Sequence, residues 1–169
     1  MCALVVSAWL AMAGTAHACA FADRPATKMS RAHAATALRC LIAHERAQHG
    51  LRAWRPDRRL ALAARRHARD MVRRRYFGHD SPGGRNVVRR VGRTGYYRRC
   101  MPCSVGENLH WGHGRGTAPA AIVRAWMSSP AHRRVLLSRR FEDVGIGMVR
   151  GTPRRKARAA VTTTLVAGG

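Results

Sequence analysis

Residues 125–133 read AWMSSPAHR and residues 141–147 read FEDVGIG, and these two stretches decide the fold. In the first, Trp126 lies on the apolar face of a predicted helix, and Pro130 begins a second helix directly after it. In the second, apolar side chains alternate with glycines at a period of two, which is typical of a strand. The glycines indicate that another element approaches this strand closely.

Two earlier helices are predicted from the spacing of their apolar residues. Leu38, Leu41 and Ile42 form an apolar stripe, and Gly50 is the glycine that ends this helix. A second helix begins with Pro56 in its first turn. Its buried face is expected to consist of Leu60, Ala64, His67, Ala68 and Met71. The apolar neighbours of His67 favour a hydrogen-bonded core histidine over a ligand.

Loop signals separate the remaining elements. Residues 76–86 are rich in Gly, Asp, Ser and Pro and predict a loop, and a short helix follows over 86–92. Thr117 is the expected N-cap of the helix that contains Trp126.

The end of the chain completes the predicted sheet. Residues 151–158 predict a turn, and residues 159–166 the partner strand of the 141–147 stretch. Helices first and strands last, in a chain of 169 residues, point to an α+β fold with helices packed on a small antiparallel sheet.

The chain is strongly basic. It has 32 Lys and Arg against 8 Asp and Glu, a net charge of +24, and all the basic residues except Lys28 and Lys156 are arginines. Such a surface favours anionic partners, such as nucleic acid, anionic lipid headgroups or acidic cell-wall polymers. The arginines are spread through every predicted element, so a solvated surface without a specific anion site is an equal alternative.

The N-terminus resembles an export signal. Residues 3–16 are uncharged and apolar, too short for a comfortable membrane span, and end at a small-x-small cleavage pattern. We expect residues 1–18 to be a secretory signal peptide, although the usual positive charge before the apolar run is missing. Residues 19–35 would then form an N-terminal arm, and residues 36–169 a single domain. Because there is no second long apolar run, the mature chain is expected to be secreted and to have no transmembrane segment. We also expect it to be a monomer.

Cysteine usage agrees with export. Cleavage after residue 18 removes Cys2 and leaves four cysteines, which suggests two disulfides with three alternative pairings. We favour Cys19–Cys40, which ties the arm to a helix, and Cys100–Cys103, which closes a small loop. The alternatives are a lipid anchor on Cys19, and a zinc or redox site at the CxxC sequence. No second CxxC exists, and the preceding residues fit a lipoprotein signal poorly.

Four segments carry a recognisable order of motifs. They are LIAHERAQHGL at 41–51, YFGHDSP at 76–82, GENL at 106–109, and the AWMSSPAHR and FEDVGIG stretches. Each is weak alone, but their order and spacing over about residues 36–166 resemble the CAP superfamily of cysteine-rich secretory, antigen 5 and pathogenesis-related proteins, in its compact bacterial branch. The resemblance implies an α/β/α sandwich with a cleft where histidines and glutamates meet.

The resemblance also implies a candidate site. His79 and Glu107 match the family's histidine and glutamate, and His132 is expected to face the same cleft. Asn108 and Ser129, from the same motifs, complete the expected binding cleft. In the family this cleft can hold a divalent cation, and two imidazoles with one carboxylate suit zinc or a similar ion.

Two departures from the family pattern weaken a four-ligand metal site. Ser128 or Ser129 stands where the family has a second glutamate, and residues 161–164 read VTTT where a His or Gln is expected. The alternative is that Glu107 hydrogen-bonds a histidine and no metal binds. The nearby HWGH sequence at 110–113 is expected to be a surface loop.

Two functions from different classes remain. The first is a non-catalytic extracellular module that binds an anionic cell-envelope polymer or a lipid, with association with the cell wall as an open alternative to free secretion. The second is a metal-assisted hydrolase of peptide or cell-wall substrates, in which a cation held by His79, Glu107 and His132 activates water. Export argues against a specific nucleic-acid partner, although non-specific binding in vitro is expected.

Overall fold

The computed structural model describes residues 19–100, 102–154 and 159–169. The predicted signal peptide lies outside these residues, as does part of the predicted 151–158 turn. The helices are α1 (Arg31–Gln48), α2 (Arg58–Arg74), α3 (Val87–Gly92), α4 (Pro119–Ser128) and α5 (Pro130–Leu136), with short 3₁₀ turns at Ala26–Lys28, Tyr96–Arg99 and Gly114–Thr117. The strands are β1 (Arg55–Pro56), β2 (Val105–His113), β3 (Asp143–Arg150) and β4 (Ala160–Gly168).

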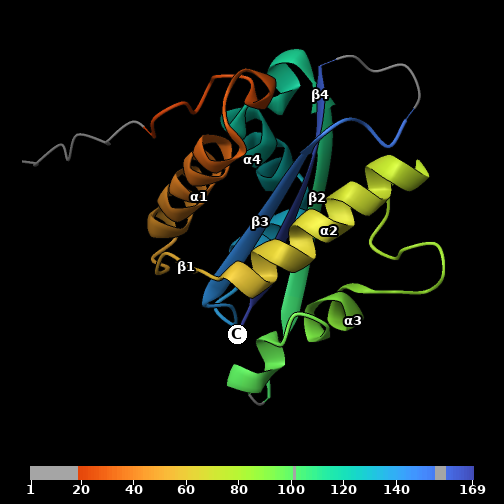
Figure 1. Cartoon of the computed structure of the whole chain (residues 1–169). Coiled ribbons are helices and arrows are strands. Elements are labelled where there is room, and N and C mark those ends of the chain that lie inside the picture. Colours follow the sequence, from red (N-terminus) through yellow and green to blue (C-terminus); the bar gives the residue numbers. More distant parts are fainter. Residues whose placement is uncertain (1–18, 101, 155–158) are drawn as a thin grey trace, which may run out of the picture.

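The strands form one sheet in the order β1-β3-β4-β2. β4 pairs antiparallel with both β2 and β3, and the two-residue β1 pairs parallel with β3. Helix α2 crosses the front of the sheet and α4 lies behind it (Figure 1). Helix α3 packs on the same face as α2, and α1 packs with α4 on the opposite face. The predicted α+β class and the α/β/α sandwich are confirmed, since β4 lies between two helical layers and is buried along its whole length.

Two apolar clusters hold the layers together. The larger joins α1, α4 and α5 to the sheet through Leu38, Trp126, Leu136, Ile146 and Leu165. The smaller joins α2 and α3 to the opposite face through Leu60, Ala64, Val91 and Val166. The glycines of β3 face α2, where a Cβ on Gly145 would overlap the backbone of Leu60 and Ala61. The close approach predicted from the alternating glycines is therefore confirmed.

Helix α1 ends as the sequence predicts. Gly50 has a φ of 65° after the C-cap, and the amide of Leu51 donates to the carbonyl of Arg46 at 2.9 Å. The amide of Gly50 donates to the carbonyl of Ala47, which completes a Schellman motif. The helix begins at Arg31, so the last residues of the expected 19–35 arm belong to the first helix of the domain.

Two predicted helix starts are wrong. Pro56 lies in β1, and Asp57 is the N-cap of α2, where its carboxylate accepts the amides of Arg59 and Leu60. Thr117 does not cap α4, because its hydroxyl donates to the Gly114 carbonyl and accepts the amide of Ala26. The buried hydroxyl of Thr117 thus fixes the N-terminal arm to the loop before α4, where Ala118 is the cap residue.

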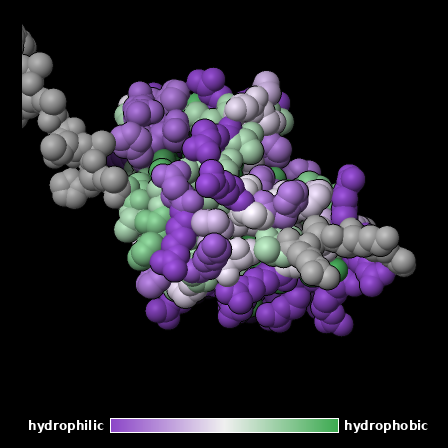
Figure 2. Space-filling model, turned by 90° about the horizontal axis from the view of Figure 1, so that it is seen from above, coloured by the Kyte–Doolittle hydropathy of each residue, from purple (hydrophilic) through white to green (hydrophobic). Residues whose placement is uncertain are grey.

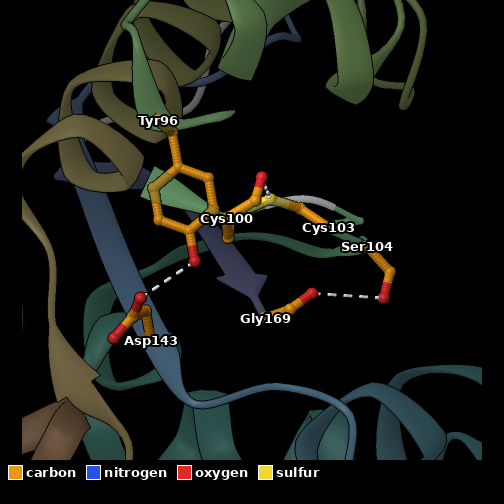
Figure 3. Close-up of a disulfide and its surroundings, with 6 residues drawn as sticks. All are labelled: Tyr96, Cys100, Cys103, Ser104, Asp143 and Gly169. Carbon is orange, nitrogen blue, oxygen red and sulfur yellow. Dashed lines mark hydrogen bonds between the residues drawn. A yellow bond between two sulfur atoms is a disulfide. The ribbon is translucent and has the colours of Figure 1, made fainter. Parts of the chain in front are cut away.

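Both favoured disulfides are present. Cys19–Cys40 ties the arm to α1 with a Cα–Cα distance of 5.8 Å. Cys100–Cys103 closes the loop before β2. The next residue, Ser104, forms hydrogen bonds with Gly169, the last residue after β4 (Figure 3).

Candidate functional site

Glu107 is the centre of the candidate site. It is the third residue of β2, on the face covered by α2 and α3, and its side chain is only 2% exposed. Its Oε1 lies 2.9 Å from Nδ1 of His79 and 3.0 Å from Nη2 of Arg90, and its Oε2 lies 2.8 Å from the same Nη2. A buried carboxylate is costly unless paired, and these two contacts supply the pairing.

His79 comes from the loop between α2 and α3 and remains accessible, with 57% of its side chain exposed. The hydrogen bond to Glu107 raises the pKa of His79, since it favours the protonated imidazole; partial burial acts in the opposite direction. The sequence-based match of His79 to Glu107 therefore corresponds to a direct contact.

His67, in helix α2, holds the same loop in place through a hydrogen bond. It is buried in α2, and its Nε2 lies 3.0 Å from the carbonyl of Gly78, the residue before His79. Burial lowers the pKa of His67, although the charge of Glu107 3.9 Å away opposes this shift. A neutral imidazole that donates to Gly78 satisfies both observations, so His67 is the hydrogen-bonded core histidine that the sequence predicts.

A tyrosine fixes the start of the loop. The hydroxyl of Tyr76 donates to Oδ2 of Asp70 at 2.6 Å and lies 3.1 Å from Oγ of Ser81. Burial and the contact with Asp70 raise the pKa of Tyr76 to about 12, so this hydroxyl stays protonated. Its role in this arrangement is to hold the loop that presents His79.

His132 approaches from the other helical layer. It lies in the first turns of α5, and its carbonyl accepts Nδ2 of Asn108 at 3.0 Å. Burial lowers the pKa of His132, and the charge of His79 lowers it further. Asn108 alternates with Glu107 along β2, so the two side chains point to opposite faces of the sheet. Ser129 occupies the N-cap position of α5 and makes no side-chain capping bond there.

The predicted surface loop at His110 is wrong. His110 lies within β2, half-buried, paired across the sheet with Thr163. Burial and the charge of His132 lower the pKa of His110 to about 4. Its Nδ1 has no hydrogen-bond partner among the described residues, and the same holds for Oγ1 of Thr163 and Oδ1 of Asn108. These three atoms mark a polar patch on the α4–α5 side of the sheet.

The cluster fits a divalent cation poorly. Both oxygens of Glu107 are already in contact with Arg90, whose fixed positive charge stands where a cation would have to bind. Within the described residues, no group of three or more His, Cys, Asp or Glu side chains is placed to hold a metal ion. The arrangement matches the alternative in which Glu107 hydrogen-bonds a histidine.

Arg90 is the site residue that sequence reasoning missed. Its Nη1 also donates to the carbonyl of Arg85 at 2.6 Å, so it joins the loop, α3 and β2. Helix α3 buries Val91 and most of the Arg90 side chain, but one arginine among so many carries no distinguishing pattern in the sequence. In the sequence, Arg90 differs from the other arginines only by its position next to Val91, an apolar residue of a short predicted helix.

Comparisons with known proteins agree with this fold. The family model described as "CAP: Cysteine-rich secretory protein family" matches residues 40–166. Two proteins of Bacillus subtilis strain 168 are each 31% identical: the uncharacterized protein YkwD over 105 residues, and the uncharacterized membrane protein YlbC over 107 residues. Each match covers 62% of this chain but only 38% and 28% of those proteins, so the chain spans less than half of their length.

Two solved structures share the architecture. An extracellular protein of Bacillus anthracis str. Ames that contains an SCP domain superposes with a TM-score of 0.64 at 23% identity, over 82% of this chain and 43% of that one. An outer surface protein of Borrelia burgdorferi superposes with a TM-score of 0.66 at 18% identity, over 83% of this chain and 95% of that one. At these identities the likeness establishes the fold. Together with the family match over most of its length, it shows that the chain belongs to the cysteine-rich secretory protein (CAP) family.

Proposed function

We propose that this protein is a secreted, non-catalytic binding module whose basic surface holds an anionic or lipid-like ligand of the cell envelope. The observation that carries this proposal is the uncompensated positive charge. Five of the eight acidic residues already lie within 4.0 Å of an Arg or His: Asp57, Asp70, Glu107, Glu142 and Asp143. Few carboxylates remain to neutralise the other arginines, so the surface attracts anions over a long range.

The character of the surface supports the same proposal. Seen from above, most of the molecule is hydrophilic, and hydrophobic residues occupy smaller areas (Figure 2). No helix in the described part of the chain is both long and apolar enough to span a membrane. Two disulfides and the names of the structural neighbours, one extracellular and one an outer surface protein, support a location outside the cell.

The Glu107 cluster supports a structural role over a catalytic one. A general base needs a carboxylate or imidazole within reach of a substrate and free to take a proton. Glu107 is buried and held by Arg90 and His79, which leaves it no free oxygen to act as a base. Metal-assisted hydrolysis with His79, Glu107 and His132 stays the alternative, and zinc titration tests it.

The test is sedimentation of the secreted protein with vesicles of phosphatidylglycerol and, as the control, phosphatidylcholine. We expect binding to the anionic vesicles that weakens steeply as salt rises, because exposed charges are screened. The isosteric variant Glu107→Gln should bind equally well. Equal binding to neutral vesicles, or no binding to anionic ones, would contradict the proposal.

A calorimetric zinc titration addresses the alternative directly. We expect no tight one-to-one binding to the wild-type protein, because Arg90 occupies the carboxylate. Tight binding that is lost in both His79→Ala and Glu107→Gln would establish a metal site and favour the hydrolase. Circular dichroism of both variants checks that they remain folded.

A further inference from the structure

A cavity of about 480 Å³, lined in part by Arg90 and His67, lies between α2, the loop that carries His79, and α3. Its polar lining consists mainly of Arg66 and Asp70 from α2, Ser81 and Arg85 from the loop, and Arg90 and Arg93 from α3 and its C-cap. Four arginines from three separate segments therefore converge on one hollow. The fold thus gathers arginines that are far apart in the sequence, in which arginine occurs throughout.

One of the four arginines is already committed. Arg90 is 9% exposed at its side chain and donates to both oxygens of Glu107 and to the carbonyl of Arg85. These bonds fix the wall of the cavity and the backbone of Arg85. Arg90 thus acts as a support, and its charge is balanced by Glu107.

The other three arginines are uncompensated. Across residues 19–100, 102–154 and 159–169, no Asp or Glu oxygen lies within 4.0 Å of the guanidinium of Arg66, Arg85 or Arg93. Asp70 is the acidic residue in the lining; it accepts the hydroxyl of Tyr76 and lies 3.8 Å from Arg74, so its charge is partly engaged. Like charges around one cavity repel each other, and an anion between them removes that repulsion.

The row of arginines continues around α3. A second hollow of about 360 Å³ is lined by Arg85, Arg89, Gly92 and Arg93, so it shares two arginines with the first. A ligand with more than one anionic group could therefore contact both hollows. This arrangement suits a repeating or extended anion better than an isolated ion.

We propose that the cavity lined by Arg66, Arg85 and Arg93 binds the phosphate group of a phosphate-bearing cell-envelope molecule. The proposal rests on the function proposed above and names its site and ligand class. Guanidinium groups bind phosphate through paired, charge-assisted N–H donors, and a phosphate can accept several such forks at once. A phosphate monoester or diester is smaller than the cavity, which leaves room for the attached glycerol or sugar.

The test is calorimetric titration of the secreted protein with glycerol 1-phosphate, alongside sedimentation with phosphatidylglycerol vesicles, at constant ionic strength. The pocket variant is Arg66→Gln, Arg85→Gln, Arg93→Gln. The control variant, Arg58→Gln, Arg115→Gln, Arg124→Gln, removes the same charge from exposed positions outside both hollows. We expect the pocket variant to lose at least about tenfold in affinity, since each charge-assisted contact to phosphate contributes roughly that factor, and the control to change by less than about threefold.

The outcomes separate the two proposals. If the wild-type protein binds glycerol 1-phosphate and the pocket variant does not, the phosphate comes from a soluble or polymeric molecule. If the wild-type protein binds only the vesicles and the pocket variant does not, the phosphate belongs to a lipid headgroup. Equal losses in the pocket and control variants would overturn the cavity while leaving the general anionic module in place. No binding to either probe would overturn both. Because the substitutions break none of the ion pairs of the described residues, neither variant should melt below the wild-type protein, which circular dichroism checks.

Discussion

Nη2 of Arg90 lies 3.0 Å from Oε1 and 2.8 Å from Oε2 of Glu107, so a single guanidinium nitrogen bridges both oxygens of a buried carboxylate. The pair joins α3 to the edge strand β2. The loop that carries His79 contacts Glu107 directly, and Arg90 also lines the cavity formed with Arg66, Arg85 and Arg93. The positive charge that faces Glu107 is therefore supplied by the chain itself, through Arg90 and in part through His79.

Arg90→Met should destabilise the fold strongly. It leaves Glu107 buried with only the partly exposed His79 as a partner, and breaking a buried ion pair on one side costs about 3–5 kcal/mol. Urea unfolding at pH 7.5 measures this loss. The double variant Arg90→Met, Glu107→Leu should regain much of the stability, because it leaves no unpaired buried charge. A loss below about 1 kcal/mol for Arg90→Met would show that the pair behaves like a surface salt bridge.

Much of the fold could be predicted because its signals are local. The alternating glycines of β3, the Gly50 helix end and the buried face of α2 all depend on spacing within one segment. β2 was missed because its pattern mixes Gly, His and Trp with partly buried residues on both faces, as suits an edge strand. β1 was missed because it has two residues whose pairing is decided only by β3.

The site was only partly predictable for a different reason. Glu107 and His79 belong to sequence motifs, so their meeting could be expected. Arg90 and the cavity arginines could not be singled out, because arginine occurs throughout the chain and only the folded loop decides which ones converge. His110 was misassigned because its place in the sheet depends on pairing with Thr163 of β4 and on the approach of His132 from α5, which its own neighbours in sequence do not reveal.

The ionisation of His79 should depend on Glu107. The hydrogen bond to Glu107 holds the pKa of His79 above its ordinary value of 6.5. A raised histidine pKa stabilises the fold fully below pH 6.5, and that contribution is lost as pH rises through the folded-state pKa. Two-dimensional NMR titration of the imidazole should show the raised pKa in the wild-type protein and a fall in Glu107→Gln. An unchanged pKa in that variant would contradict the assignment.

His110 should destabilise the protein in mild acid. Its pKa falls from 6.5 to about 4 on folding, so between these values the unfolded chain binds a proton that the folded chain does not. The contribution of neutral His110 to the free energy of unfolding is therefore fully present above pH 6.5. It decreases as pH falls toward 4, by an amount on the order of 2–3 kcal/mol. Urea unfolding at several pH values between these limits should show a shallower decrease for His110→Phe. Parallel pH profiles for the two proteins would rule this group out as the source.

The two disulfides should contribute unequally to stability. Cys19–Cys40 has a sequence separation of 21 and Cys100–Cys103 one of 3. In the chain-entropy account the longer loop contributes about 3 kcal/mol and the shorter about 2 kcal/mol, since the longer crosslink restricts the unfolded chain more. Thermal unfolding of Cys19→Ser, Cys40→Ser beside Cys100→Ser, Cys103→Ser measures the difference. A larger loss for the second pair would indicate that the short loop acts through the native contacts of Tyr96 and Ser104 instead.

The contact between β3 and α2 should tolerate no added side-chain carbon. Gly145 faces the backbone of Leu60 and Ala61, and an alanine Cβ there would overlap atoms that cannot rotate away. Gly145→Ala must push α2 off the sheet, so we expect a loss of about 3 kcal/mol or more, at the upper end of overpacking effects. Gly116→Ala is the matched control, because a Cβ at that position meets nothing within 4 Å and its φ is not positive. Equal melting temperatures for the two variants would mean that α2 does not pack on β3 as closely as this structure shows.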